Sequence, residues 1–148
     1  MSLLRFGGWA NLVIAAAHVV ALGWAWTVFR WVDVEEPMRE LAAANAALPY
    51  LLTLLTAAFF LIFGLYALSA AGDLRRLPLL RPVLGFIAVV YLLRATLLGG
   101  ITDLLAGDVK QVTFAAIALV IGLCYASGVL VARKSRKPIE IARPELSS

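Results

Sequence analysis

Three long stretches of the chain contain no charged side chain: residues 6–29, 41–72 and 111–132. An α-helix rises 1.5 Å per residue, so about 20 apolar residues cross the ~30 Å hydrocarbon core of a bilayer. The whole chain has 148 residues, of which 63% are hydrophobic. A soluble domain of this size cannot bury that much apolar surface, because small domains leave a large fraction of their area in water. The three stretches therefore predict membrane-spanning helices.

A fourth span is predicted around Arg94, which interrupts an otherwise uncharged stretch between Arg81 and Asp103. A central Arg costs roughly 2.5–3.5 kcal/mol on membrane insertion, whereas each Leu, Ile, Val or Phe returns roughly 0.3–0.6 kcal/mol. Residues 83–98 contain ten of these apolar residues, which together offset the cost of the Arg. The helix is expected to insert with Arg94 inside it.

The expected fold class is all-α, a four-helix transmembrane bundle with both termini in the cytoplasm. One domain covers residues 1–132, and a basic cytoplasmic tail covers residues 133–148. The expected spans are about 7–30, 49–71, 82–101 and 111–132.

Residues that favour helix ends bound these spans. Pro49 and Pro82 suit first turns, and Gly72 and Gly99-Gly100 suit helix ends. Asp108 with Gln111 forms a pattern like a capping box at the start of the last helix. In the link between the first two spans, residues 32–49, a short interfacial helix is predicted.

The orientation follows from the Lys and Arg residues of the short loops, which favour the cytoplasmic side. One side carries nine cations: Arg5, Arg75, Arg76, Arg81, Arg133, Lys134, Arg136, Lys137 and Arg143. The other side has only Arg30, Arg39 and Lys110, beside six acidic residues. The prediction is a multi-pass protein of a bacterial inner (plasma) membrane, since the Ala-, Leu- and Arg-rich composition is typical of bacteria.

Several function classes are disfavoured by residue counts. With Cys124 as the single cysteine and His18 as the single histidine, neither a disulfide nor a cysteine-based zinc site can form within the chain. A haem held by two histidines is excluded in the same way. No cofactor and no metal are predicted, no catalytic motif is present, and the loop cations indicate orientation rather than nucleic-acid binding.

Four residues make a candidate ligand-binding site within the membrane. Asn11 and His18 lie on one face of the first span, and Tyr91 lies one turn from Arg94 in the third. Ionisable side chains inside a membrane are expensive, so they indicate function by default. The site is expected to hold a polar or anionic lipid headgroup or a small anion. Structural roles stay open, because Arg94 can snorkel to the interface and His18 can bridge two helices.

The fourth span carries Ala118, Gly122 and Ala126 at four-residue steps. Small residues at this spacing let another helix approach closely. The stripe predicts a packing face, against either the same chain or a second copy.

In length, number of spans and short basic middle loop, the chain resembles small bacterial four-helix inner-membrane proteins of uncharacterised function, DoxX-like proteins among them, in layout only. Three functions follow as hypotheses. The favoured one is a non-enzymatic accessory subunit or a binder of a lipid-like or anionic small molecule. The others are an oligomeric transporter or exporter and, less favoured, a membrane enzyme using His18. The expected partners are membrane lipids and either further copies or a larger membrane complex.

Overall fold

The computed structural model describes residues 3–96 and 105–134, and these residues are almost entirely helical. No strand occurs in this part of the chain, so the all-α prediction is confirmed. The elements in chain order are α1 (Leu3–Ala21), the 3-10 turn η1 (Leu22–Trp24), α2 (Ala25–Trp31), α3 (Glu35–Ala44), α4 (Leu48–Ala71), α5 (Leu80–Thr96) and α7 (Val109–Lys134).

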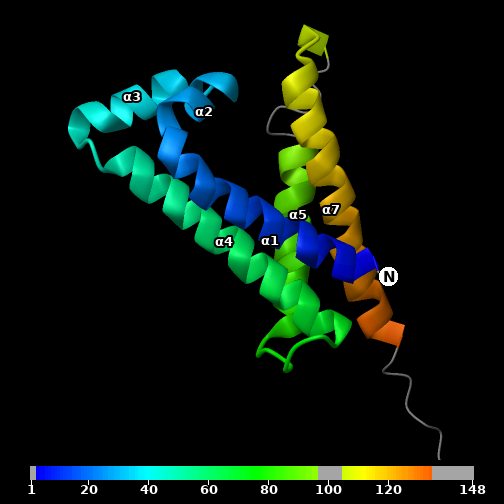
Figure 1. Cartoon of the computed structure of the whole chain (residues 1–148). Helices are drawn as coiled ribbons and strands as arrows, with labels where there is room; N and C mark the ends of the chain where they lie inside the picture. Colours follow the sequence, from blue (N-terminus) through cyan, green and yellow to red (C-terminus); the bar gives the residue numbers. More distant parts are fainter. Residues whose placement is uncertain (1–2, 97–104, 135–148) are drawn as a thin grey trace, which may run out of the picture.

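The long helices form two antiparallel pairs (Figure 1). Helix α1 lies along α4, and α5 lies along α7. The pairs meet near the N-terminal half of α1, which crosses α7, while α4 also contacts α5. They diverge toward the end that carries α2 and α3. The buried core lies where the pairs meet, and it includes Ala67, Leu84, Ile87, Ile121 and Tyr125.

Within residues 3–96 and 105–134, three helical stretches are long and apolar enough to cross a membrane: Leu3–Trp31, Leu48–Ala71 and Val109–Leu130. They coincide with the three charge-free stretches. Many large apolar side chains on the outer faces are at least half exposed, among them Phe59 and Phe86. Such a surface suits contact with lipid rather than with water. The chain is therefore consistent with a membrane-embedded protein.

The predicted span 82–101 is described as far as Thr96, as helix α5. Its 17 residues extend about 25 Å at 1.5 Å per residue, slightly less than the hydrocarbon thickness. Pro82 lies in its first turn as expected. The predicted helix end at Gly99-Gly100 lies outside the described residues, as does the tail from residue 135 onward.

The first span, expected as one continuous helix over 7–30, is instead interrupted. Helix α1 stops at Ala21, three residues form η1, and α2 begins at Ala25. Trp24 has a non-helical backbone with φ −133° and ψ 35°. The neighbouring Gly23 is a poor helix former, and short 3-10 segments within a helix commonly mark a hinge. The end of the first span is thus a separate helical segment.

Helix α3 is the short helix predicted between the first two spans. Its first residue, Glu35, accepts hydrogen bonds from Arg30 of α2 and from Arg39 one turn further along α3. These two hydrogen bonds, of which the one from Arg30 has the larger effect, hold the pKa of Glu35 below its usual value. The Arg39 guanidinium also lies 5.6 Å from the ring centre of Trp26. Helices α2 and α3 are therefore joined as one unit.

The link after α4 is held in a defined shape. Gly72 ends the helix in the left-handed conformation with φ +87°, as predicted. Asp73 forms an ion pair with Arg5 at the start of α1. The Ser69 hydroxyl donates to the Arg75 carbonyl at 2.8 Å and accepts from the Leu77 amide at 3.0 Å. A single hydroxyl therefore fixes the backbone on both sides of Arg76.

At the start of α7 only one side of the predicted capping box is present, the one in which the Asp108 side chain accepts from backbone amides. The Asp108 carboxylate accepts from the amides of Lys110 and Gln111 at 3.0 and 3.1 Å. The Gln111 side chain does not return the bond. It donates to the Val32 carbonyl at 3.3 Å instead, so it connects α7 to the other helix pair.

Glycines allow the helices of each pair to approach closely. A Cβ built on Gly64 of α4 would lie 2.8 Å from Leu12 and 3.0 Å from the Gly8 carbonyl oxygen in α1. One built on Gly122 of α7 would lie 3.1 Å from the Cβ of Tyr91 in α5. Ala118 is buried beside Gly122, and Ala126 packs against the same core. The small-residue stripe of the last span therefore faces a helix of its own chain.

Gly64→Ala should destabilise the protein by about 1–3 kcal/mol, because the added methyl group meets a backbone oxygen that cannot move aside cheaply. Gly85→Ala is the matched control: Gly85 lies inside α5 with open space around its Cβ position. That change should be neutral or stabilising by up to about 1 kcal/mol through helix propensity. Thermal unfolding in mild detergent measures both, and equal midpoints for the two variants would contradict this packing.

Candidate functional site

A fully buried asparagine lies where the two helix pairs meet. Asn11 of α1 has no exposed surface. Its amide nitrogen donates to the Gly7 carbonyl at 2.9 Å and to the Tyr125 hydroxyl of α7 at 3.2 Å. Its amide oxygen accepts from the Tyr91 hydroxyl of α5. Asn11 therefore joins α1 to both helices of the second pair.

The network continues into the remaining long helix. The Tyr125 hydroxyl, which accepts from Asn11, donates to the Phe63 carbonyl of α4 at 2.7 Å. The rings of Tyr91 and Tyr125 stack with centroids 6.2 Å apart. Every polar hydrogen of the amide and of the two hydroxyls is used. The network thus connects α1, α4, α5 and α7 through Asn11 and Tyr125.

Of the four predicted site residues, the structure joins Asn11 and Tyr91 directly. The sequence argument missed Tyr125, although a signal was present. Tyr125 lies seven residues after Ala118 and three after Gly122, so it belongs to the packing face already recognised on the last span. A tyrosine on such a face needs a partner for its hydroxyl when it is buried.

His18 takes part in a different set of contacts. Its Nδ1 lies 2.8 Å from the Ile14 carbonyl, one turn back in α1. A carbonyl only accepts, so Nδ1 carries the hydrogen, and in the neutral ring Nε2 is an acceptor. The ring packs against Phe60 of α4, with centroids 5.1 Å apart. No hydrogen bond to Nε2 occurs within the described residues.

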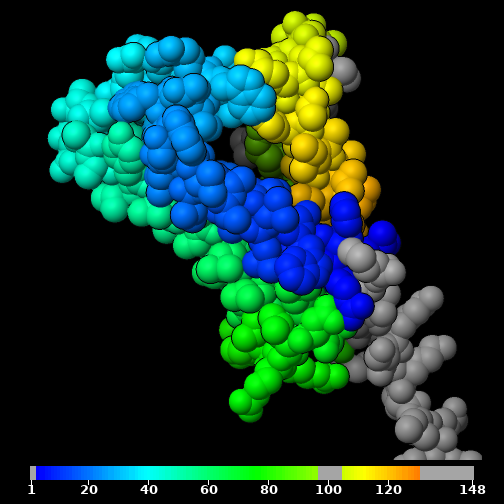
Figure 2. Space-filling view, viewed as in Figure 1, coloured from blue at the N-terminus to red at the C-terminus, as the bar shows by residue number. Residues whose placement is uncertain are grey.

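His18 also lines a cavity of about 470 Å³ in the half of the molecule where the helix pairs diverge. The walls come from α1, α2, α3, α4 and Phe114 of α7, and they include Ala17, Val28, Phe29, Met38 and Leu52. In Figure 2 the surface is hollowed between the blue residues of α1 and α2 and the yellow start of α7. No charged side chain lines the cavity among the described residues.

The polar groups of this cavity are few. The side chains with polar groups are His18, Trp31 of α2, and Thr53 and Thr56 of α4. Both hydroxyls donate to carbonyls of their own helix, those of Pro49 and Leu52 at 2.8 and 2.9 Å. The hydrogens of these two hydroxyls are therefore engaged, so toward a bound molecule both threonines can only accept. Cavities of roughly 300–1,000 Å³ with apolar walls and a few polar groups are typical of small-molecule sites.

The edge of the cavity formed by Trp31 and the turn after α2 contacts the start of α7, which belongs to the other helix pair. Lys110 forms an ion pair with Asp33 and donates to the Trp31 carbonyl at 3.2 Å. The rings of Trp31 and Phe114 meet edge to face, with centroids 6.2 Å apart. These contacts bring the α2–α3 turn over the start of α7.

Arg94, the fourth predicted residue, is half-buried in α5. Its Nη2 donates to the Gln111 side chain of α7 at 3.5 Å, and Gln111 in turn holds the Val32 carbonyl. The hydrogen bond from Arg94 to Gln111 and the one from His18 to the Ile14 carbonyl do not join Arg94 and His18 to each other. A shared binding role for the four residues stays a prediction.

Among the described residues no group of three or more His, Cys, Asp and Glu side chains could hold a metal ion. Comparisons with protein-family models, with curated proteins and with solved structures found no match. The likeness to DoxX-like proteins therefore stays a prediction from the layout of the chain.

Tyr91→Phe and Tyr125→Phe should each lower stability by about 1–2 kcal/mol, since each removes a hydroxyl that satisfies Asn11 inside the protein. Tyr66→Phe is the matched control, because the Tyr66 hydroxyl makes no hydrogen bond to the described residues. The measurement is thermal unfolding in detergent. The double variant Tyr91→Phe/Tyr125→Phe should deviate from the sum of the single changes, and additivity would argue against a shared network.

Proposed function

We propose that the protein is a four-span protein of a bacterial inner membrane, with both termini in the cytoplasm, that binds a neutral, lipid-like molecule without catalysing a reaction. Three spans rest on helix length and composition. The fourth is the span proposed over residues 82–101, whose described part is α5, which packs along α7.

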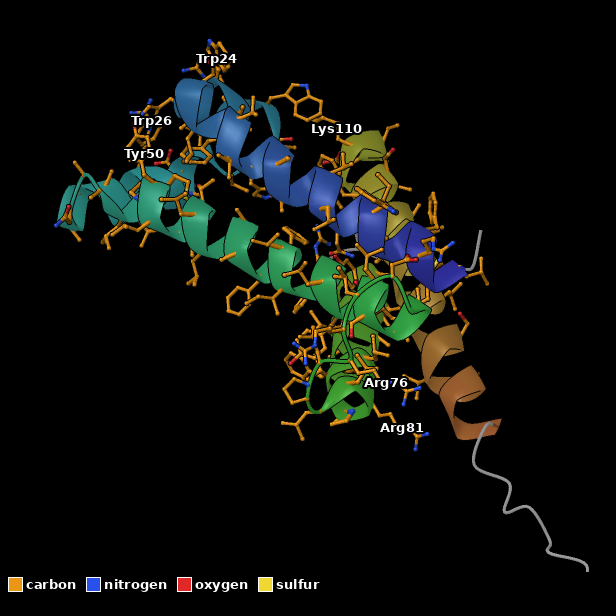
Figure 3. The ribbon with its side chains drawn as sticks, turned by 60° about the horizontal axis from the view of Figure 1, so that its bottom comes forward. Trp24, Trp26, Tyr50, Arg76, Arg81 and Lys110 are labelled. Atoms are coloured by element: carbon orange, nitrogen blue, oxygen red, sulfur yellow. The ribbon has the colours of Figure 1, made fainter. Side chains whose placement is uncertain are left out.

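The proposed orientation is supported by the distribution of side chains along the molecule. Figure 3 shows Arg76 and Arg81 at one end, and Trp24, Trp26, Tyr50 and Lys110 toward the other. The first end also carries Arg5 and Arg75, whereas the acidic α3 lies at the second. An excess of Lys and Arg marks the cytoplasmic side, and Trp and Tyr mark membrane interfaces.

The observation that carries the proposed function is the apolar cavity with the Nε2 acceptor of His18 in its wall. A neutral apolar ligand suits it better than an anion, because none of the described residues that line it is charged and burying an unpaired charge is costly. A ligand hydroxyl could donate to Nε2. The proposed ligand class is therefore a long apolar molecule with one donor group, such as a long-chain alcohol or a diglyceride.

The orientation can be tested by labelling with a membrane-impermeant maleimide in spheroplasts. In a Cys124→Ala background, Ala43→Cys in α3 should be labelled from outside. Leu74→Cys in the link after α4 should be labelled only after the membrane is permeabilised. The opposite pattern would show that the proposed orientation is inverted. Labelling of both positions from outside would show that α4, which lies between them, does not cross the membrane.

The ligand class can be tested with 1-dodecanol and its methyl ether, in which a methyl group replaces the donor hydrogen. A ligand that binds the folded protein raises its unfolding temperature according to its affinity. Dodecanol should bind wild type about fivefold more tightly than the ether, the factor for one hydrogen bond of about 1 kcal/mol.

His18→Leu should abolish the preference for the alcohol while the ether still binds, because the apolar walls remain. Thr113→Val is a control, since Thr113 lies in α7 outside the cavity and its hydroxyl bonds its own helix. Equal affinity of wild type for both probes, or an unchanged preference in His18→Leu, would refute the role of Nε2.

A further inference from the structure

One face of α2 covers the cavity that His18 lines, which we call the His18 cavity. Four lining residues follow one another at steps of three or four along α2 and its C-terminal cap: Ala25, Val28, Phe29 and Val32. Met38 of α3 lines the same cavity. We call the segment made of α2, the turn after it and α3, residues 25–44, the roof of the His18 cavity.

The roof is one unit with a break in the helix on each side. Hydrogen bonds from Arg30 and Arg39 to Glu35 join α2 to α3. Directly before the roof, Trp24 leaves the helical conformation, and directly after it Asn45 is extended, with φ −161° and ψ 126°. Segments that move as a body turn on a few residues at the ends of such elements.

The roof packs weakly compared with the long helices. No residue of α3 is buried. The buried residues of α2 are Ala25 and Phe29, and both line the His18 cavity. A segment with few buried apolar contacts opens more easily than a well-packed core. The roof can therefore move at a lower cost in free energy than α1, α4, α5 or α7.

The turn after α2 is held to the start of α7 by a small set of polar contacts, which we call the latch. Lys110, labelled in Figure 3, forms an ion pair with Asp33 and donates to the Trp31 carbonyl at 3.2 Å. Gln111 donates to the Val32 carbonyl at 3.3 Å. The Lys110 and Asp33 side chains are 44% and 51% exposed, and exposed ion pairs contribute little to stability because water and salt screen them. The latch is therefore easier to break than the buried network of Asn11.

We propose that the roof is a gate, which opens the His18 cavity when Lys110 and Gln111 release the turn after α2. The four long helices stay packed during this movement, because the network of Asn11 includes no residue of the roof. The gate rests on the proposed function only for the kind of molecule that it admits. The opening itself is measured without any ligand.

The test measures how fast N-ethylmaleimide alkylates a cysteine placed under the roof, with the full chain in mild detergent. The reporter is Ala25→Cys in a Cys124→Ala background, because Ala25 lines the cavity and is only 5% exposed. Lys110→Met removes both contacts of the lysine and should raise the alkylation rate about fivefold. Combined with Gln111→Leu, it should raise the rate at least tenfold, roughly the factor for two contacts of this kind. An unchanged rate in this double variant would overturn the proposal.

Two controls separate gate opening from general loosening. Thr113→Val also removes a polar group near the start of α7, but the Thr113 hydroxyl bonds its own helix, so the reporter rate should stay as it was. The native Cys124 is buried in α7 and does not line the His18 cavity. In chains that keep Cys124 and lack the reporter, its alkylation should not respond to the latch variants. An equal acceleration at Cys124 would mean that the whole bundle loosens, and this too would overturn the gate.

Closing the latch covalently should give the opposite change. A carbodiimide joins the Lys110 amine and the Asp33 carboxylate through an amide and takes up the water that is lost. The reporter should then be alkylated at least tenfold more slowly, whereas carbodiimide treatment of Lys110→Met should give no such protection. An unchanged rate in the cross-linked protein would contradict the gate.

The ligand is tested separately with the same reporter. Saturating 1-dodecanol should protect Ala25→Cys from alkylation if it occupies the His18 cavity. If dodecanol gives no protection while the latch variants still change the rate, the proposed ligand is refuted and the gate is supported.

Discussion

The hydrogen bonds of one buried amide hold the two helix pairs together. Asn11 binds Tyr91 and Tyr125 across the interface, and Tyr125 passes the contact on to α4. In a membrane interior no water replaces a lost partner. Sliding or separating the pairs would leave an amide and two hydroxyls unsatisfied at once, so the network favours a single register. The stacked tyrosine rings fill the space around it.

Glycine brings the helices close enough for this network to form. Lipid is as apolar as leucine, so helices in a membrane associate through close packing and polar contacts rather than through apolar burial alone. Gly64 lets α4 touch the backbone of α1 at Gly8, and Gly122 lets α7 touch α5 at Tyr91. The second of these contacts positions the tyrosine that reaches Asn11.

The sequence predicts the helices better than it predicts their partners. Charge-free stretches, Gly72 and Pro82 place the elements because these signals are local. The break at Leu22–Trp24 was missed, since one Gly in an apolar run is a weak signal. Tyr125 and Asn11 lie 114 residues apart, and no local pattern reveals such a pairing. The same holds for Gln111, which resembled a cap but bridges the two pairs.

The interruption at Leu22–Trp24 separates two tasks along the first span. The segment before it, α1, carries Asn11, whose hydrogen bonds join the two helix pairs. The segment after it, α2, carries Phe29 and Trp31 over the His18 cavity and is held to α7 by a few rim contacts. Breaking those rim contacts leaves the Asn11 network intact. For the ligand proposed to bind in the His18 cavity, we therefore expect the residence time to depend on α2 and its turn, and to be adjustable without loss of fold.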